Sequence, residues 1–141
     1  MATREIVGWS MADHLRTELS IDALVMALQR HSPSAGLIHH SDRGVHYAAE
    51  PYRAVLERHG IIQSMSRRGN CLDNAPMESV FAALKVEHVH QCRFHTREAA
   101  KAAVFDYIEV FYNRQRLHSA LGYRTPAEAR ASLEGITRLA A

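Results

Sequence analysis

Residues 36–44 carry the sequence Gly-Leu-Ile-His-His-Ser-Asp-Arg-Gly, and this stretch decides the fold class. Its first half, 36–40, is a short strand candidate, which the turn-forming residues at 41–44 close. Asp42 therefore lies at the C-terminal end of the predicted strand. In a parallel sheet this end of the strands is where ligands bind.

Helical patterns flank this strand on both sides. Upstream, apolar residues recur at helical spacing over residues 21–28, Thr17 is the expected N-cap, and Pro33 follows the end of the helix. Downstream, a proline in the first turn and a final glycine mark a second helix over residues 50–60.

Two further strands are expected, over residues 61–65 and 4–11. The second expectation rests on Ile6, Val7 and Trp9, which favour β-structure. Strands that alternate with helices indicate a mostly parallel sheet covered by helices. Three short strands would make a small sheet for that architecture.

The second half of the chain is predicted to be helical. One helix begins near Pro76 and carries Glu78, and a long amphipathic helix begins at Thr96. Residues 125–128 form a capping box with proline at the first helical position, so they open a C-terminal helix. We interpret residues 1–141 as one domain, of which residues 96–141 are a helical C-terminal extension. Five large side chains are expected in the core: Trp9, Phe81, Tyr107, Ile108 and Phe111.

Composition sets wide bounds. The chain has 141 residues, of which 47% are apolar and 23% charged, as in ordinary globular proteins. Its 17 basic and 15 acidic residues give a net charge of +2, too small an excess to indicate DNA binding by itself. No apolar run approaches the length of a membrane span, and the N-terminus does not resemble a signal peptide. Together with only two cysteines, this predicts a cytosolic protein without a membrane partner.

Two acids stand where a metal could bind. Asp42 lies at a strand end and Glu78 in the first turns of a helix, and such carboxylates can together hold Mg²⁺. Two Mg²⁺ ions can activate a hydroxyl group and stabilise the leaving oxygen of a phosphodiester. The chain has fifteen acids, however, so spacing alone does not single out this pair.

Three longer stretches carry a family resemblance. HHSDRG at 39–44, SMSRRGNCLDNAPMES at 64–79 and FYNRQRLHSALGYRTPAEA at 111–129 resemble the catalytic domain of DDE-type insertion-sequence transposases, which are related to retroviral integrases. The family pattern places thirty-five residues between its second Asp and its Glu, and 77 − 42 = 35 residues separate Asp42 from Glu78. It also places a basic residue seven positions after the Glu, where this chain has Lys85.

The resemblance implies a ribonuclease-H-like integrase core, Mg²⁺ or Mn²⁺ as cofactor, and DNA strand transfer between mobile-element ends and target DNA. It implies that Asp42 and Glu78 are catalytic metal ligands and that Lys85 contacts DNA. In this chain we expect an incomplete α/β core, with about three short strands and four or five helices.

The resemblance also implies a third carboxylate, an Asp on the first strand of the sheet. The segment REIVGW at 4–9 resembles the third strand of the family, so the first two strands are expected to be absent. Asp13 and Asp22 do not match the missing position. We therefore expect the chain to be inactive alone. The alternative function is a non-catalytic DNA-binding or inhibitory module that pairs with full-length transposase or with itself.

Basic residues in two loops suggest further DNA contacts. Arg67 and Arg68 precede the helix of Glu78, and Arg suits bidentate contact with phosphate, so we favour a DNA role over a solvated turn. Arg114 and Arg116 follow the long helix. They fit a DNA-backbone contact and, equally, cations that stabilise a helix C-terminus.

A cluster of histidines and one cysteine supplies a rival interpretation. His88, His90, Cys92 and His95 have a spacing that could suit Zn²⁺ if the segment were extended. Structural zinc sites usually pair ligands from two separated pieces of chain, so a polar connection between helices is the favoured interpretation.

Overall fold

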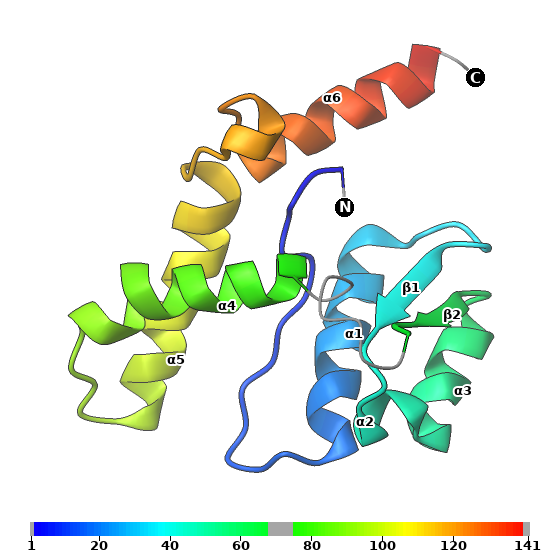
Figure 1. Cartoon of the computed structure of the whole chain (residues 1–141), viewed down its shortest axis with the longest axis horizontal. Coiled ribbons are helices and arrows are strands. Elements are labelled where there is room, and N and C mark those ends of the chain that lie inside the picture. Colours follow the sequence, from blue (N-terminus) through cyan, green and yellow to red (C-terminus); the bar gives the residue numbers. More distant parts are fainter. Residues whose placement is uncertain (1, 68–74, 140–141) are drawn as a thin grey trace. The chain divides into compact units, whose positions relative to one another are not determined.

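The computed structural model describes residues 2–67 and 75–139. It divides into two compact units, Val7–Ala83 on the one hand and Met1–Ile6 with Leu84–Ala141 on the other. Figure 1 shows both strands within the first unit, whereas the second is helical. Among the described residues, no helix is long and apolar enough to cross a membrane.

The unit of residues 7–83 is built on two parallel strands. β1 covers Ile38–Ser41 and β2 covers Ile62–Met65, and their register pairs Ile38 with Ile62 and Ser41 with Met65. Both strands were expected from the sequence within two residues at each end. Because they are parallel, their C-terminal ends lie at the same edge of the sheet.

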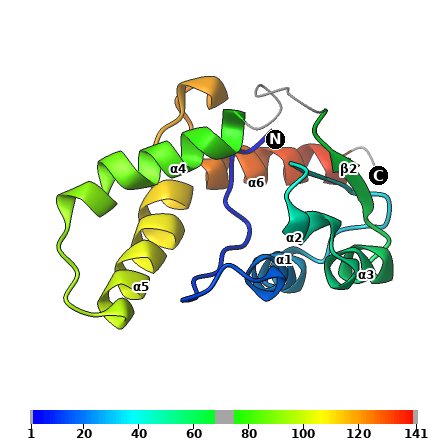
Figure 2. The same cartoon turned by 60° about the horizontal axis from the view of Figure 1, so that its bottom comes forward.

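Three helices of this unit precede β2 in the described sequence. They are α1 (Thr17–His31), α2 (Val45–Ala48) and α3 (Glu50–Arg58). Figures 1 and 2 show α1 and α3 side by side on one side of the strands. The apolar faces of both helices form the core with the residue before β2, as Leu24, Leu28, Tyr52, Leu56 and Ile61. Burial of these side chains is the main stabilising term for this unit.

The opposite side of the sheet is less covered. Ile38 and Ile62 face each other across the strands and are 63% and 57% exposed. The two strands therefore have one face covered by helices and a second face on which Ile38 and Ile62 are exposed to solvent.

The strand predicted over residues 4–11 is wrong, because this segment is irregular throughout. Ile6 instead bonds the side chain of Asn113, whose Oδ1 accepts from the Ile6 N–H at 3.0 Å and whose Nδ2 donates to the Ile6 carbonyl at 3.0 Å. A side-chain amide thus supplies both hydrogen bonds that a neighbouring strand would make. Glu5 is fixed next to it by an ion pair of 2.7 Å with Arg130.

The second unit is a set of short helices joined by tight turns. It comprises the end of α4 (Ala75–Glu87), η2 (Val89–Gln91), α5 (Arg97–Phe105), η3 (Asp106–Tyr112), η4 (Ser119–Leu121) and α6 (Pro126–Leu139). Thr96 caps α5, since its hydroxyl accepts from the Ala99 N–H at 3.1 Å. By contrast, Thr17 is the first residue of α1 and not its N-cap, which is Arg16.

The segment η3 is a π-helix that continues α5. Its wider turn is visible in the bond from the Asn113 N–H to the carbonyl of Ile108, five residues back. Tyr107, Ile108 and Tyr112 are buried there, at 3–5% exposure. The expected core positions of Tyr107 and Ile108 are confirmed. Those of Phe81 and Phe111 are wrong, since both side chains are exposed.

The capping box at the start of α6 is confirmed. The Glu128 carboxylate accepts from the Thr125 N–H at 2.8 Å, and the Thr125 hydroxyl accepts from the Glu128 N–H at 3.2 Å. The Thr125 N–H, together with the Thr125 hydroxyl that donates to the same carboxylate at 3.1 Å, holds the pKa of Glu128 below its ordinary value, because bonds to the charged carboxylate favour it.

Candidate active site

Asp42 follows β1 directly and is exposed. Its Oδ1 accepts a hydrogen bond of 2.7 Å from the backbone N–H of Gly44, which closes the turn between β1 and α2. The sequence prediction that placed Asp42 at the C-terminal end of a parallel strand is confirmed in this respect. At this position a carboxylate faces solvent from the edge of the sheet.

Three bonds join this turn to the end of β2. The carbonyl of Ser41 accepts from the Ser66 N–H at 2.8 Å and from the Ser66 hydroxyl at 3.2 Å. The Arg43 Nε donates to the carbonyl of Ser66 at 2.8 Å. Because Ser41 and Ser66 are 8% and 4% exposed, the two bonds between them are sheltered from water and hold the backbone just before Asp42.

Two histidines of β1 point to different partners. The ring nitrogens of His40 lie 3.0 and 3.2 Å from the hydroxyls of Ser64 in β2 and of Ser66 just after it. The Nε2 of His39 lies 3.0 Å from the hydroxyl of Tyr52 in α3. Burial lowers the pKa of His39, so this ring favours its neutral form beside the tyrosine.

Glu78 and Lys85 lie on the same helix. Glu78 is exposed in the first turn of α4, and Lys85 is exposed in its last turn. Seven residues correspond to about two helical turns, so both side chains project from one face of α4. The helical placement expected from the sequence therefore holds for both residues.

Asp42 and Glu78 fit a divalent cation in chemistry. Both are carboxylates in contact with solvent, and Mg²⁺ and Mn²⁺ take oxygen ligands while keeping several waters. Within the described residues, no group of three or more His, Cys, Asp or Glu side chains is arranged to hold a metal. Asp42 and Glu78 are the two carboxylates at the positions of the Asp and Glu in the transposase pattern.

The basic residues predicted to bind DNA lie in different settings. Arg67 is exposed just beyond β2, and Arg114 is exposed after η3. Arg68 lies outside the described residues. Arg116 is half-buried, and its Nε and Nη2 donate to the Glu87 carboxylate over 2.7–3.0 Å. This contact gives Arg116 a structural partner that the sequence did not indicate.

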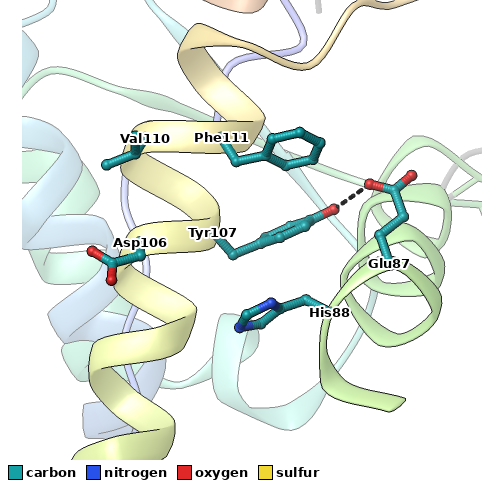
Figure 3. Close-up of a pocket in the computed structure, with 6 residues that line it drawn as sticks. All are labelled: Glu87, His88, Asp106, Tyr107, Val110 and Phe111. Carbon is teal, nitrogen blue, oxygen red and sulfur yellow. Dashed lines mark hydrogen bonds between the residues drawn. The ribbon is translucent and has the colours of Figure 1, made fainter. Parts of the chain in front are cut away.

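The Glu87 carboxylate is the centre of a polar network at the end of α4. It also accepts from the Tyr107 hydroxyl at 2.8 Å, and Figure 3 shows this bond spanning the two helices. The hydrogen bonds from Arg116, and then that from Tyr107, lower the pKa of Glu87. Burial and the neighbouring Glu87 raise the pKa of Tyr107. The network holds a negative charge between two helices of the second unit.

An open pocket of about 610 Å³ lies beside this network. Figure 3 shows Tyr107 and Phe111 pointing toward Glu87, while Asp106 and Val110 point to the other side of their helix. The ring of His88 stacks on Tyr107, with centroids 5.4 Å apart. This pocket belongs to the second unit and includes neither Asp42 nor Glu78.

The zinc interpretation loses its structural basis. Residues Val89–Gln91 form a 3-10 turn, so His88, His90 and Cys92 do not alternate along an extended segment. His88 packs its ring on Tyr107, and Cys92 is an exposed free thiol. The polar connection between helices that the sequence favoured is what the structure contains.

Two family models match this chain. Both are described as an integrase core domain, and they cover residues 1–71 and 78–132. The chain belongs to the integrase core domain family.

Relatives of this integrase core come from bacterial insertion elements. It is 52% identical to the uncharacterized 31 kDa protein of insertion element IS600 from Shigella sonnei, over 91% of this chain and 47% of the relative. It is 45% identical to transposase InsF of IS3A from Escherichia coli, over 89% of this chain and 44% of the relative. It is 41% identical to the transposase of IS904 from Lactococcus lactis, over 89% of this chain and 50% of the relative. The integrase core thus spans about half the length of the curated relatives that it matches.

A solved structure agrees with the fold. The catalytic core domain of BIV integrase aligns with a TM-score of 0.55 and 21% identity, over 84% of this chain and 75% of that one. The predicted ribonuclease-H-like integrase core is therefore confirmed, in an incomplete form with a two-stranded sheet among the described residues.

Proposed function

We propose that this integrase core supplies part of a metal-dependent DNA strand-transferase that acts in transposition. The observation that carries the proposal is Asp42, an exposed carboxylate at the C-terminal end of β1, in a chain that belongs to the integrase core domain family. Support comes from the relatives, since two of them are named transposases of insertion sequences.

In this proposal Asp42 and Glu78 hold Mg²⁺ or Mn²⁺. The metal, when bound, would stabilise the charge that develops on phosphodiester oxygens. Lys85 follows Glu78 along α4, and its ammonium group is suited to hold a DNA phosphate. Arg67, Arg68 and Arg114 would add sequence-independent contacts to the DNA backbone.

A third carboxylate is part of the proposal. Fixing two metal ions requires ligands beyond Asp42 and Glu78, and the family resemblance assigns that role to an Asp on a strand ahead of residue 4. The 141-residue polypeptide, taken alone, is therefore proposed to be inactive in strand transfer. The first 25 residues contain two aspartates, Asp13 and Asp22, and two glutamates. Neither aspartate matches the position of the missing Asp in the family.

The test is joining of DNA 3′ ends with Mg²⁺ or Mn²⁺. It compares the 141-residue polypeptide with a version extended upstream by the two strands that the resemblance implies. Within the extended version, Asp42→Asn and Glu78→Gln are expected to abolish joining, because each removes a metal ligand. The matched control is Asp22→Asn, which changes an exposed carboxylate on α1 and should leave joining intact.

Other results would contradict parts of the proposal. Joining by the extended protein that survives Asp42→Asn would remove the metal role of that residue. Joining by the short polypeptide would show that another side chain supplies the third ligand. DNA binding without joining by the extended protein would favour the alternative function, a DNA-binding or inhibitory module.

A further inference from the structure

The turn after β1 places the Asp42 carboxylate where a side chain at residue 44 would lie. A Cβ atom built on Gly44 would lie 2.8 Å from the Oδ1 of Asp42 and 3.4 Å from the Cδ2 of Tyr47. The backbone φ of Gly44 is −58°, a value open to every residue. A side chain here would therefore meet the Asp42 carboxylate in its present orientation, whereas the backbone conformation does not require glycine.

The same residue also donates to that oxygen. The Gly44 N–H lies 2.7 Å from Oδ1 of Asp42, a short bond of the kind that charged acceptors form. One backbone unit thus both bonds the carboxylate and, by lacking a Cβ, makes room for it. The N–H holds the oxygen, and the missing Cβ leaves its position open.

We propose that Gly44 is a positioning residue for the Asp42 carboxylate. The proposal rests on the proposed function of Asp42, and it adds that the affinity of this carboxylate for a divalent cation depends on residue 44. A ligand held in one orientation before the metal arrives loses less freedom on binding. Groups that orient metal ligands typically change metal affinity about 10–100-fold when they are altered.

The surroundings decide how an added methyl group would be accommodated. The backbone just before Asp42 is held by the two bonds from Ser66 to the Ser41 carbonyl, and the side chain of Arg43 adds a bond to the Ser66 carbonyl. The carboxylate, in contrast, is the exposed end of a side chain with rotatable bonds. The methyl group of Gly44→Ala is therefore expected to displace the carboxylate and not the turn, with little change in stability.

The experiment uses the whole 141-residue chain and four variants. Gly44→Ala adds the methyl group, Asp42→Ala removes the acceptor, and Asp42→Asn keeps an acceptor oxygen without the charge. Gly135→Ala is the matched control, because a Cβ at this exposed position of α6 meets nothing within 4 Å. Each protein is followed by the ¹³Cγ shift of Asp42 where present, the amide exchange of residue 44, and the unfolding midpoint in urea. Mn²⁺ affinity is measured from the paramagnetic broadening of amide signals near Asp42.

For Gly44→Ala we expect a changed ¹³Cγ shift, faster exchange of the residue 44 amide, and Mn²⁺ affinity lowered about 10-fold or more at an unchanged unfolding midpoint. Asp42→Ala should speed the same exchange, whereas Asp42→Asn should preserve its protection. The control variant should match the parent chain in Mn²⁺ affinity.

Two failures can be told apart. Equal Mn²⁺ affinity in the parent chain and in Asp42→Asn would overturn the metal role of Asp42, and the carbon shift and amide exchange alone would then decide the positioning role. If Gly44→Ala leaves the ¹³Cγ shift and the amide exchange unchanged, the positioning role is overturned. An unchanged Mn²⁺ affinity in this variant, beside a loss in Asp42→Asn, would overturn its influence on metal binding.

Discussion

The side-chain amide of Asn113 bonds both the N–H and the carbonyl of Ile6, at 3.0 Å each, across 107 residues of sequence. Asn113 is 6% exposed, so both partners would lose these bonds in a sheltered place if the amide were removed. We predict that Asn113→Ala lowers the free energy of unfolding by about 1–3 kcal/mol, measured in urea. Gln115→Ala, two residues along and exposed, should cost far less. Equal losses in the two variants would show that the amide bonds contribute nothing specific.

The ion pair of Glu87 and Arg116 should make the free energy of unfolding depend on pH in the acid range. Arg116 lowers the folded-state pKa of Glu87 below its ordinary 4.5. The stabilisation is therefore present above about pH 4.5 and is lost as pH falls through the lower folded value. We predict that Glu87→Gln removes about 1–2 kcal/mol near pH 7 and flattens the pH dependence of stability between pH 3 and 5. Glu134→Gln, which alters a more exposed ion pair with Arg130, should retain the slope of the parent chain.

His118 should make the free energy of unfolding depend on pH in a second range, above that of Glu87. Burial, followed by the nearby Arg116, lowers its pKa below 6.5. The unfolded chain takes up a proton below pH 6.5 that the folded chain resists, so stability falls as pH drops below this value. His118→Gln should therefore reduce the loss of stability between pH 6.5 and 5, as measured by urea unfolding at each pH. An unchanged loss over this range would contradict the assignment to His118.

A tight contact of a different kind involves Gly8. A Cβ at this position would lie 2.2 Å from the backbone oxygen of Ala23 and 2.8 Å from the backbone nitrogen of Ala27, both in α1. Because backbone atoms cannot move aside cheaply, we predict that Gly8→Ala lowers the unfolding midpoint by an amount that corresponds to about 1–3 kcal/mol. Gly44→Ala, whose clash involves a side-chain end, is the internal comparison. Equal stability of the two variants would contradict the distinction.

DNA binding should depend on salt through the loop arginines. We predict that Arg67→Ala and Arg68→Ala each weaken binding about uniformly across sequences and reduce the salt slope by about 1, measured by fluorescence anisotropy. Arg53→Ala on α3 serves as the exposed control. An unchanged slope would assign both loop arginines to a solvated turn.

Arg114 and Arg116 extend this measurement to the second unit. Arg114 is exposed, so Arg114→Ala should lower the salt slope without a change in stability. Arg116→Ala breaks the contact with Glu87 and should lower stability. The salt dependence of DNA binding by Arg116→Ala is measured at a temperature where the variant is folded. A reduced slope would support the predicted DNA contact of Arg116, and an unchanged slope would leave Arg116 with only its structural role in the ion pair with Glu87.

Local signals predicted much of the secondary structure. Helical spacing, Pro51 and the capping box at Thr125 located α1, α3 and α6, because they act within a few residues of themselves. The strand expected at 4–11 failed for the opposite reason. The β-preference of Ile6 and Val7 carries no information on a partner, and the partner of Ile6 is a side chain 107 residues away.

The candidate site divides in the same way. The position of Asp42 at a strand end could be predicted from residues 36–44 alone. The bond of Arg116 to Glu87, twenty-nine residues apart, left no trace in the local pattern, so the sequence could not separate a structural arginine from a DNA-binding one. Phe111 likewise fits a helical apolar face, but it lies in a segment whose turns are not α-helical.

The π-helical segment sets the phase of everything that follows it. In an α-helix, residues five apart are turned by about 140° from each other, so Tyr107 and Tyr112 could not both face inward. The wider turn aligns them, and both are buried. Winding the same residues as an α-helix would turn Asn113 by about 100° away from Ile6, whereas deleting one residue at the same time would largely compensate for that rotation. The wider turn, and with it the residue count of this segment, therefore decides whether the Asn113 amide reaches Ile6.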